Sequence, residues 1–248
     1  MKLVLADSKS FKDSISIASD LVNEVKFKAG TDGLEMVAMD PANVAMVILK
    51  ILSSCFVEYK IDGEEEVAVS LNNLKQILRR AKSDDILSLE TTDDAKLKIE
   101  LKSKTTRSFS IPLLEVDDRD QKVPELSFPI KIEMHSSTLS ESIEDVGVVA
   151  ESVTFLGDKN QLLIKAQGDL SKAFIEIKPD DKTRIKTDSE EKFKAKYSLE
   201  YLKKMVGGMK LSDQAVLHFN TDYPMKLEYK VIDKLVLSFI LAPRVDND

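Results

Sequence analysis

The chain has 248 residues, 43% of them hydrophobic and 32% charged, and its 36 Lys and Arg against 43 Asp and Glu give a net charge of −7. A chain of this size can bury roughly 70–75% of its unfolded surface, which excludes a disordered protein. A single cysteine, Cys55, excludes an internal disulfide and a cysteine-based zinc cluster and favours a reducing compartment. The acidic balance argues against simple DNA coating, which needs clustered Lys and Arg.

The N-terminal segment reaches Asp7 before any apolar stretch long enough for a signal peptide. No stretch approaches the roughly 18 apolar residues of a membrane span. We therefore expect a soluble, cytoplasmic protein with no targeting signal and no membrane partner.

The first half of the chain predicts two helices among many strands. Apolar residues at helical spacing predict amphipathic helices over 9–23 and 71–82. Gly30 to Gly33 and Asp62-Gly63 predict hairpin turns. Short apolar periods predict antiparallel strands over 25–29, 44–52, 67–71, 86–89, 97–101 and 109–113.

An acidic segment divides the chain. Residues 115–126 hold five acids, two bases and a proline, which is typical of an exposed connector. Beyond it, the two helix patterns recur at an offset of 128, over 139–151 and 199–210, and one register holds across both helices and the strands between them. The sequence predicts an α+β fold of two tandem copies, each an antiparallel sheet with two helices on one face. The expected domains are 1–114 and 127–248, joined by the connector 115–126.

Basic residues gather on the second helix of each copy. Lys75, Arg79 and Lys82 follow one face of helix 71–82, which has no acid, whereas helix 139–151 has acids and no base. For one helix, a solvated face is the simpler interpretation. Two repeat-related basic helices in an acidic protein favour a shared polyanion, bound through its backbone phosphates. The helix over 199–210 contributes Lys203, Lys204 and Lys210.

Signatures of catalysis are weak. His135 and His218 belong to no Ser or Cys nucleophile pattern, and Gly30 and Gly33 do not open a helix as a phosphate loop would. The acid run over 62–66 could hold a hard cation, although a solvated loop is the better interpretation. We expect no catalytic residues, no metal and no cofactor.

Four segments carry a family resemblance: LEMVAMDPANV at 34–44, LKQILRR at 74–80, TRSF at 106–109 and LAPR at 241–244. Together they resemble archaeal sliding clamps of the proliferating cell nuclear antigen family, over the whole chain. The resemblance implies a ring of three subunits around duplex DNA, with helices lining the hole and sheets forming the outer wall. It implies that the residues facing DNA are Lys12, Lys75, Arg79, Lys203, Lys204 and Lys210.

The resemblance also implies a subunit boundary. Its expected ion pairs join Arg80, Lys82 and Arg107 of one subunit to Glu141 and Asp145 of the next. Such a head-to-tail contact must close into a ring. Exposed pairs contribute only about 0–1 kcal/mol each, so pairing of strand 107–113 with strand 172–177 must supply much of the rest.

A pocket under the connector is the family's other working surface, and it receives a glutamine-led peptide ending in two aromatics. By resemblance, the partners are DNA polymerase, the clamp loader, flap endonuclease and DNA ligase. The lining residues would be Met39, Val44, Met46, Val123, Pro224, Ile240, Ala242 and Pro243.

The resemblance implies a non-enzymatic processivity factor for DNA replication and repair. Two alternatives stay open at this point: a metal-dependent nucleic-acid enzyme, and a clamp-fold scaffold that never encircles DNA. The sequence suits a homotrimer but equally allows a mixed ring with related chains.

Overall fold

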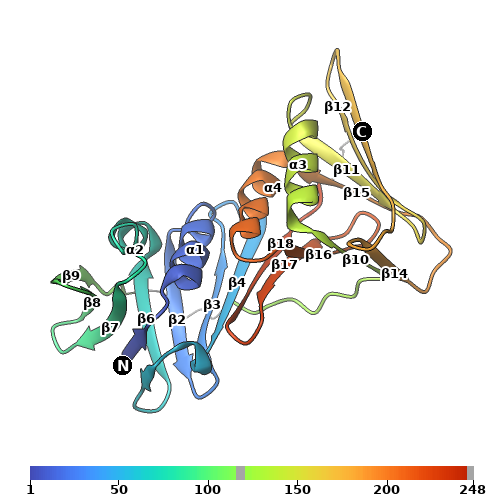
Figure 1. The fold of residues 1–248 in the computed structure, drawn as a ribbon. Coiled ribbons are helices and arrows are strands. Elements are labelled where there is room, and N and C mark those ends of the chain that lie inside the picture. The colour runs from blue at the N-terminus through green and yellow to red at the C-terminus, as the bar shows by residue number, and fades with distance from the viewer. Residues whose placement is uncertain (116–120, 245–248) are drawn as a thin grey trace. The chain divides into compact units, whose positions relative to one another are not determined.

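The computed structural model describes residues 1–115 and 121–244 and confirms the α+β class (Figure 1). The chain forms two compact units. Part of the expected connector, residues 116–120, and the acidic end of the chain, residues 245–248, lie outside the described residues. The first unit comprises Met1–Pro41, Val47–Val123 and Val231–Leu237, and the second comprises Ala42–Met46, Pro124–Lys230 and Ser238–Asp248.

The first unit combines two strand arrays with two helices. One array has the order β5-β1-β7-β8-β9, and in the other β4, β3, β2 and β6 follow one another. The helices α1 (Lys9–Ala18) and α2 (Leu71–Leu78) pack together, and a short 3-10 helix η1 (Ser53–Cys55) follows β4. The strands are β1 (Lys2–Leu5), β2 (Glu24–Gly30), β3 (Gly33–Met39), β4 (Ala45–Leu52), β5 (Glu58–Lys60), β6 (Glu65–Ser70), β7 (Ile86–Thr92), β8 (Lys96–Lys102) and β9 (Thr106–Pro112).

The second unit repeats this plan. Its arrays have the orders β14-β10-β16-β17-β18 and β13-β12-β11-β15. Its helices are α3 (Ser136–Val146), α4 (Leu199–Met205) and the 3-10 helix η2 (Val206–Lys210). The strands are β10 (Ile130–His135), β11 (Ser152–Gly157), β12 (Leu162–Gln167), β13 (Lys172–Ile177), β14 (Arg184–Thr187), β15 (Phe193–Ser198), β16 (Gln214–Phe219), β17 (Met225–Val231) and β18 (Leu235–Leu241).

The strand orders confirm the internal duplication. When each strand of the first unit is exchanged for its equivalent in the second, β1 for β10 and β9 for β18 for example, one order becomes the other. The registers agree as well, because Lys28 faces Glu66 across β2 and β6, and the residues 128 positions later, Leu156 and Lys194, face each other across β11 and β15.

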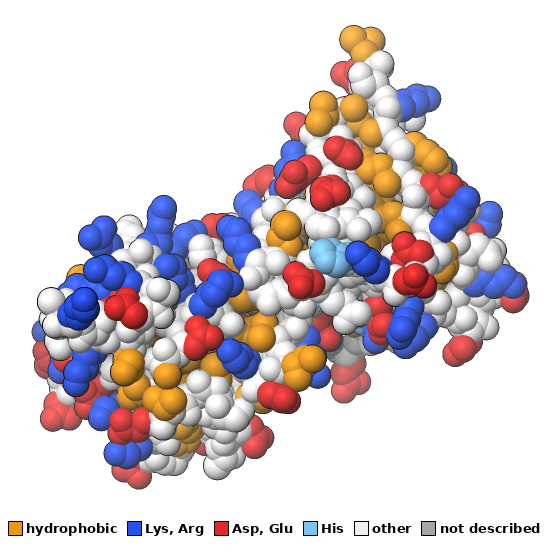
Figure 2. Space-filling view, viewed as in Figure 1, with side chains coloured by type: hydrophobic (Ala, Val, Ile, Leu, Met, Phe, Trp, Pro, Cys, Tyr) orange, Lys and Arg blue, Asp and Glu red, His pale blue; other side chains and the backbone are white. Residues whose placement is uncertain are grey.

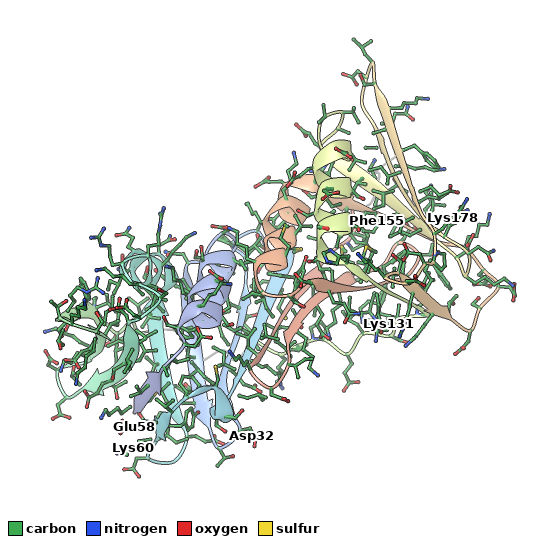
Figure 3. All side chains as sticks on the ribbon, viewed as in Figure 1. Asp32, Glu58, Lys60, Lys131, Phe155 and Lys178 are labelled. Atoms are coloured by element: carbon green, nitrogen blue, oxygen red, sulfur yellow. The ribbon has the colours of Figure 1, made fainter. Side chains whose placement is uncertain are left out.

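The core follows the strand alternation. In β11 and β12 the inward positions are fully buried, and helices α3 and α4 pack on this sheet. Phe155, labelled in Figure 3, lies with its ring centroid 5.7 Å from that of Tyr197 and 6.1 Å from that of Phe219. These rings form the centre of the second unit.

Helix ends and one turn differ from expectation. Helices α1 and α2 end at Ala18 and Leu78, where the chain tightens into turns with i→i+3 hydrogen bonds. The apolar residues of these turns remain buried, so the helical sequence pattern continues past the end of each helix. Helix α3 begins earlier, where the His135 side chain accepts a hydrogen bond from the Ser137 amide. The predicted Asp62-Gly63 hairpin is wrong, since β5 and β6 belong to different sheets.

Candidate nucleic-acid interface and self-association surfaces

In the first unit, two of the expected DNA-facing lysines tie the helices together. The Lys12 ammonium donates to the Ala81 carbonyl at 3.3 Å. The Lys75 ammonium donates to the Ser16 carbonyl at 3.2 Å and pairs with the Asp20 carboxylate at 2.7 Å. Arg79, at the C-terminal cap of α2, is exposed. Lys12 and Lys75, by contrast, are half-buried.

In the second unit, Lys203 repeats the role of Lys75. Its ammonium donates to the carbonyl of Gly147, the C-terminal cap of α3, at 3.3 Å. Cations are stabilised at helix C-termini, where backbone carbonyls lack intrahelical partners. Lys204 pairs with Glu200 at 3.0 Å, and Lys210 is exposed at the end of η2. The 128-residue offset between Lys75 and Lys203 was the sequence signal for this shared capping role.

Charge is separated by helix. Arg79 and Arg80 are exposed at the end of α2, whereas Glu141, Glu144 and Asp145 are exposed on α3. Figure 2 shows basic side chains gathered over α2 and acidic side chains over α3. The exposed end of α2 can therefore attract a polyanion, and α3 can attract a basic surface.

A buried carboxylate organises the expected basic side of the boundary. Asp85, which sequence analysis missed, accepts a hydrogen bond from the Lys82 amide at 2.6 Å and pairs with the Arg107 guanidinium. Arg107 also donates to the Arg80 carbonyl at 2.9 Å. The Lys82 amide, followed by Arg107, lowers the pKa of Asp85 to about 2. An acid within a basic run gives no sequence signal of burial, so only the fold reveals it.

Strands β9 and β13 are among the edge strands of the described residues. Strand β9, which carries Arg107, ends the order of its sheet, and strand β13 ends the order of another. An edge strand presents unpaired backbone amides and carbonyls that can pair with a second chain. These are the two strands expected to meet across the subunit boundary, and their pairing stays a prediction.

The expected peptide-pocket residues are divided between the units. Met39 and Val123 belong to the first unit and the other six to the second. Within the second unit, the Ala242 amide donates to the Val44 carbonyl at 2.9 Å. Val123 is 46% exposed, whereas Met46 and Ile240 are buried. A single pocket lined by all eight stays a prediction.

Two carboxylates of the acid run over 62–66 have structural partners. Glu65 pairs with the N-terminal amine at 2.8 Å, and Glu66 pairs with Lys26 at 2.9 Å. Burial lowers the pKa of His218, and nearby Lys226 and Lys131 lower it further. Over residues 1–115 and 121–244, no group of three or more His, Cys, Asp and Glu could hold a metal ion. No helix of this part is long and apolar enough to cross a membrane.

Comparison with known proteins assigns the whole architecture. The family model described as "Proliferating cell nuclear antigen, N-terminal domain" matches residues 2–121, and the model of the C-terminal domain matches residues 122–244. The chain belongs to this family. The repeat seen in the strand orders is thus the two-domain plan of the family.

Relatives and a solved structure agree over nearly the full length. A "DNA polymerase sliding clamp" from Nanoarchaeum equitans is 36% identical over 249 residues, covering 99% of this chain and 100% of that protein. One from Thermococcus sibiricus is 34% identical over 246 residues, 99% of each chain. A crystal structure of PCNA from Thermococcus kodakaraensis superimposes with a TM-score of 0.91 at 25% identity, covering 98% of this chain and 99% of that one.

Proposed function

We propose that the protein is a DNA polymerase sliding clamp that works without catalysis of its own. The observation that carries the proposal is full-length membership of the family, whose relatives bear that name. The proposed assembly is a ring of three identical chains around duplex DNA. The edge strands β9 and β13 and the opposite charges of α2 and α3 support it, because they make the surface complementary to a second copy of itself.

DNA would be held without sequence preference. The exposed cations Arg79 and Lys210, with Lys204, would supply charge to phosphates and no base-reading groups. Lys12, Lys75 and Lys203, which are bound to backbone carbonyls, would contribute mainly through their field. Polymerase, clamp loader, flap endonuclease and ligase would be tethered through short peptides at the eight pocket residues.

The decisive experiment separates encirclement from simple binding. The protein is loaded by an archaeal clamp-loading ATPase onto a nicked circular plasmid, washed at high salt, and the plasmid is then cut once. We expect salt-resistant retention on the circle and loss after cutting. Equal retention on linear DNA would contradict a topological clamp. Chelator-sensitive DNA cleavage by the pure protein would favour an enzyme, and a particle mass other than three times 27.8 kDa would contradict the homotrimer.

A further inference from the structure

The outward face of the four-stranded sheet of the second unit carries a depression of about 510 Å³. Every charged residue around it is a lysine, although the chain as a whole is acidic. Leu156 and Phe174 add apolar surface, and the Phe174 side chain is 59% exposed. The lining comprises Thr154, Leu156, Lys165, Ala166, Gln167, Lys172, Ala173, Phe174 and Lys194.

The internal duplication provides a control for this surface. In the first unit, Lys28 and Lys26 pair with Glu66 at 3.2 and 2.9 Å across β2 and β6. At the equivalent positions of the second unit, Leu156 stands opposite Lys194. Lys194 thus takes the place of Glu66, and Leu156 takes the place of Lys28. The lysines at this sheet position therefore share a carboxylate in the first unit, whereas Lys194 faces an apolar side chain in the second.

Within the described residues, the three lysines lack an acidic partner. Lys172 and Lys194 form no ion pair with any described Asp or Glu. The Lys165 ammonium lies 5.6 Å from the centroid of the Phe174 ring, over its face. Because the Lys165 ammonium covers one face of the Phe174 ring, less of the ring is available for stacking with a nucleobase. The groove therefore favours carboxylates over single-stranded nucleic acid.

Duplex DNA at the basic helices would not reach this groove. Helices α3 and α4 pack on the inward face of the same sheet, where Phe155 and Ile164 are buried. Thr154 and Lys165 alternate with these residues along β11 and β12 and so lie on the opposite face. Pairing of a second chain along the edge of β13 would extend the sheet sideways and leave this outward face open.

We propose that this groove binds an acidic peptide segment of another protein, whose carboxylates pair with Lys165, Lys172 and Lys194 while an apolar side chain contacts Leu156 and Phe174. The site lies in the second unit alone and does not depend on whether the chain encircles DNA. Charge complementarity selects the occupant, because three ammonium groups without a carboxylate partner among the described residues surround a partly apolar hollow and match alternating acidic and apolar side chains.

The test uses the full-length protein and a short fluorescein-labelled peptide in which glutamates flank two leucines. Fluorescence anisotropy should show saturable binding below about 1 mM that weakens with added salt. The double variant Lys165→Gln/Lys194→Gln should bind at least about tenfold more weakly. Replacing the glutamates of the peptide by glutamines should have the same effect.

The matched control is Lys50→Gln, an outward lysine on β4 of the first unit that pairs with Glu35. It should leave the affinity unchanged. Absence of saturable binding, equal weakening by Lys50→Gln, or tighter binding of an oligothymidylate than of the peptide would each overturn the proposal. All altered side chains are exposed, so unchanged melting temperatures establish that the variants fold.

Discussion

Asp85 joins residues that we expect on the basic side of the subunit boundary. Its side chain has no exposed surface and pairs with Arg107, while the Lys82 amide donates to it. A buried carboxylate is tolerated only when its charge is compensated by such partners. Arg107, which we predict to lie at the subunit boundary, is thus positioned by contacts within its own chain. The family resemblance pointed to Arg107, and nothing in the sequence indicated Asp85, since its burial depends on the fold of β9 against the turn after α2.

We predict that Asp85→Asn lowers the melting temperature at pH 7 by roughly 2–8 °C. The pKa of Asp85 falls from 3.8 to about 2 on folding. Its stabilising effect is thus fully present above about pH 4 and is lost as the pH falls through about 2. Calorimetry should show the gap between wild type and variant closing over that range.

The control is Asp84→Asn, at the exposed neighbouring carboxylate. It should leave the melting temperature nearly unchanged. A gap between wild type and Asp85→Asn that stayed constant down to pH 2 would contradict the assigned role.

Element boundaries reflect packing more than periodicity. The helix pattern over 199–210 covers both α4 and the 3-10 turns of η2, because Val206 and Gly208 remain buried after the α-helix has ended. The sequence pattern therefore predicted the two helices of each unit and most strands correctly. It could not predict helix ends, or that β5 and β6 pair in different sheets, since those depend on contacts distant in the chain.

Gly208 allows η2 to approach strand β17. A Cβ placed at Gly208 would lie 2.2 Å from ring carbons of Tyr229, which is fully buried. We predict that Gly208→Ala destabilises the protein by about 1–3 kcal/mol, because neither the ring nor the 3-10 turn has room to move. Chemical denaturation should measure the change.

Gly30→Ala is the matched control, since a Cβ there meets nothing within 4 Å and the backbone does not adopt a positive φ. It should be close to neutral. Equal destabilisation by both variants would show that glycine flexibility, and not the contact with Tyr229, is responsible.

At the scale of the whole molecule, the separation of charge predicts how copies associate. Glu141 and Asp145 are exposed one helical turn apart on α3. We predict that Glu141→Lys/Asp145→Lys raises the dissociation constant of the oligomer at least about tenfold, because attraction to Arg80 and Lys82 becomes repulsion. Light scattering over a dilution series gives the measurement.

Adding Arg80→Glu/Lys82→Glu should restore association by exchanging the charges. The control Asp181→Lys/Asp188→Lys makes the same change in net charge at exposed sites outside α3. The predicted ion pairs would be contradicted if Glu141→Lys/Asp145→Lys left the dissociation constant unchanged, or if the control raised it equally. Pairing of the strand edges would then remain as the contact between copies.

The capping role of Lys75 and Lys203 has a consequence for movement along DNA. Both ammonium groups are held on helix carbonyls, so under the proposed function we expect a passing phosphate to gain attraction from them without a close contact that must later break. The interaction energy with the duplex would then vary little from one base pair to the next. If the chain encircles DNA as proposed, we expect low friction, because the ammonium groups at these helix ends already have carbonyl partners.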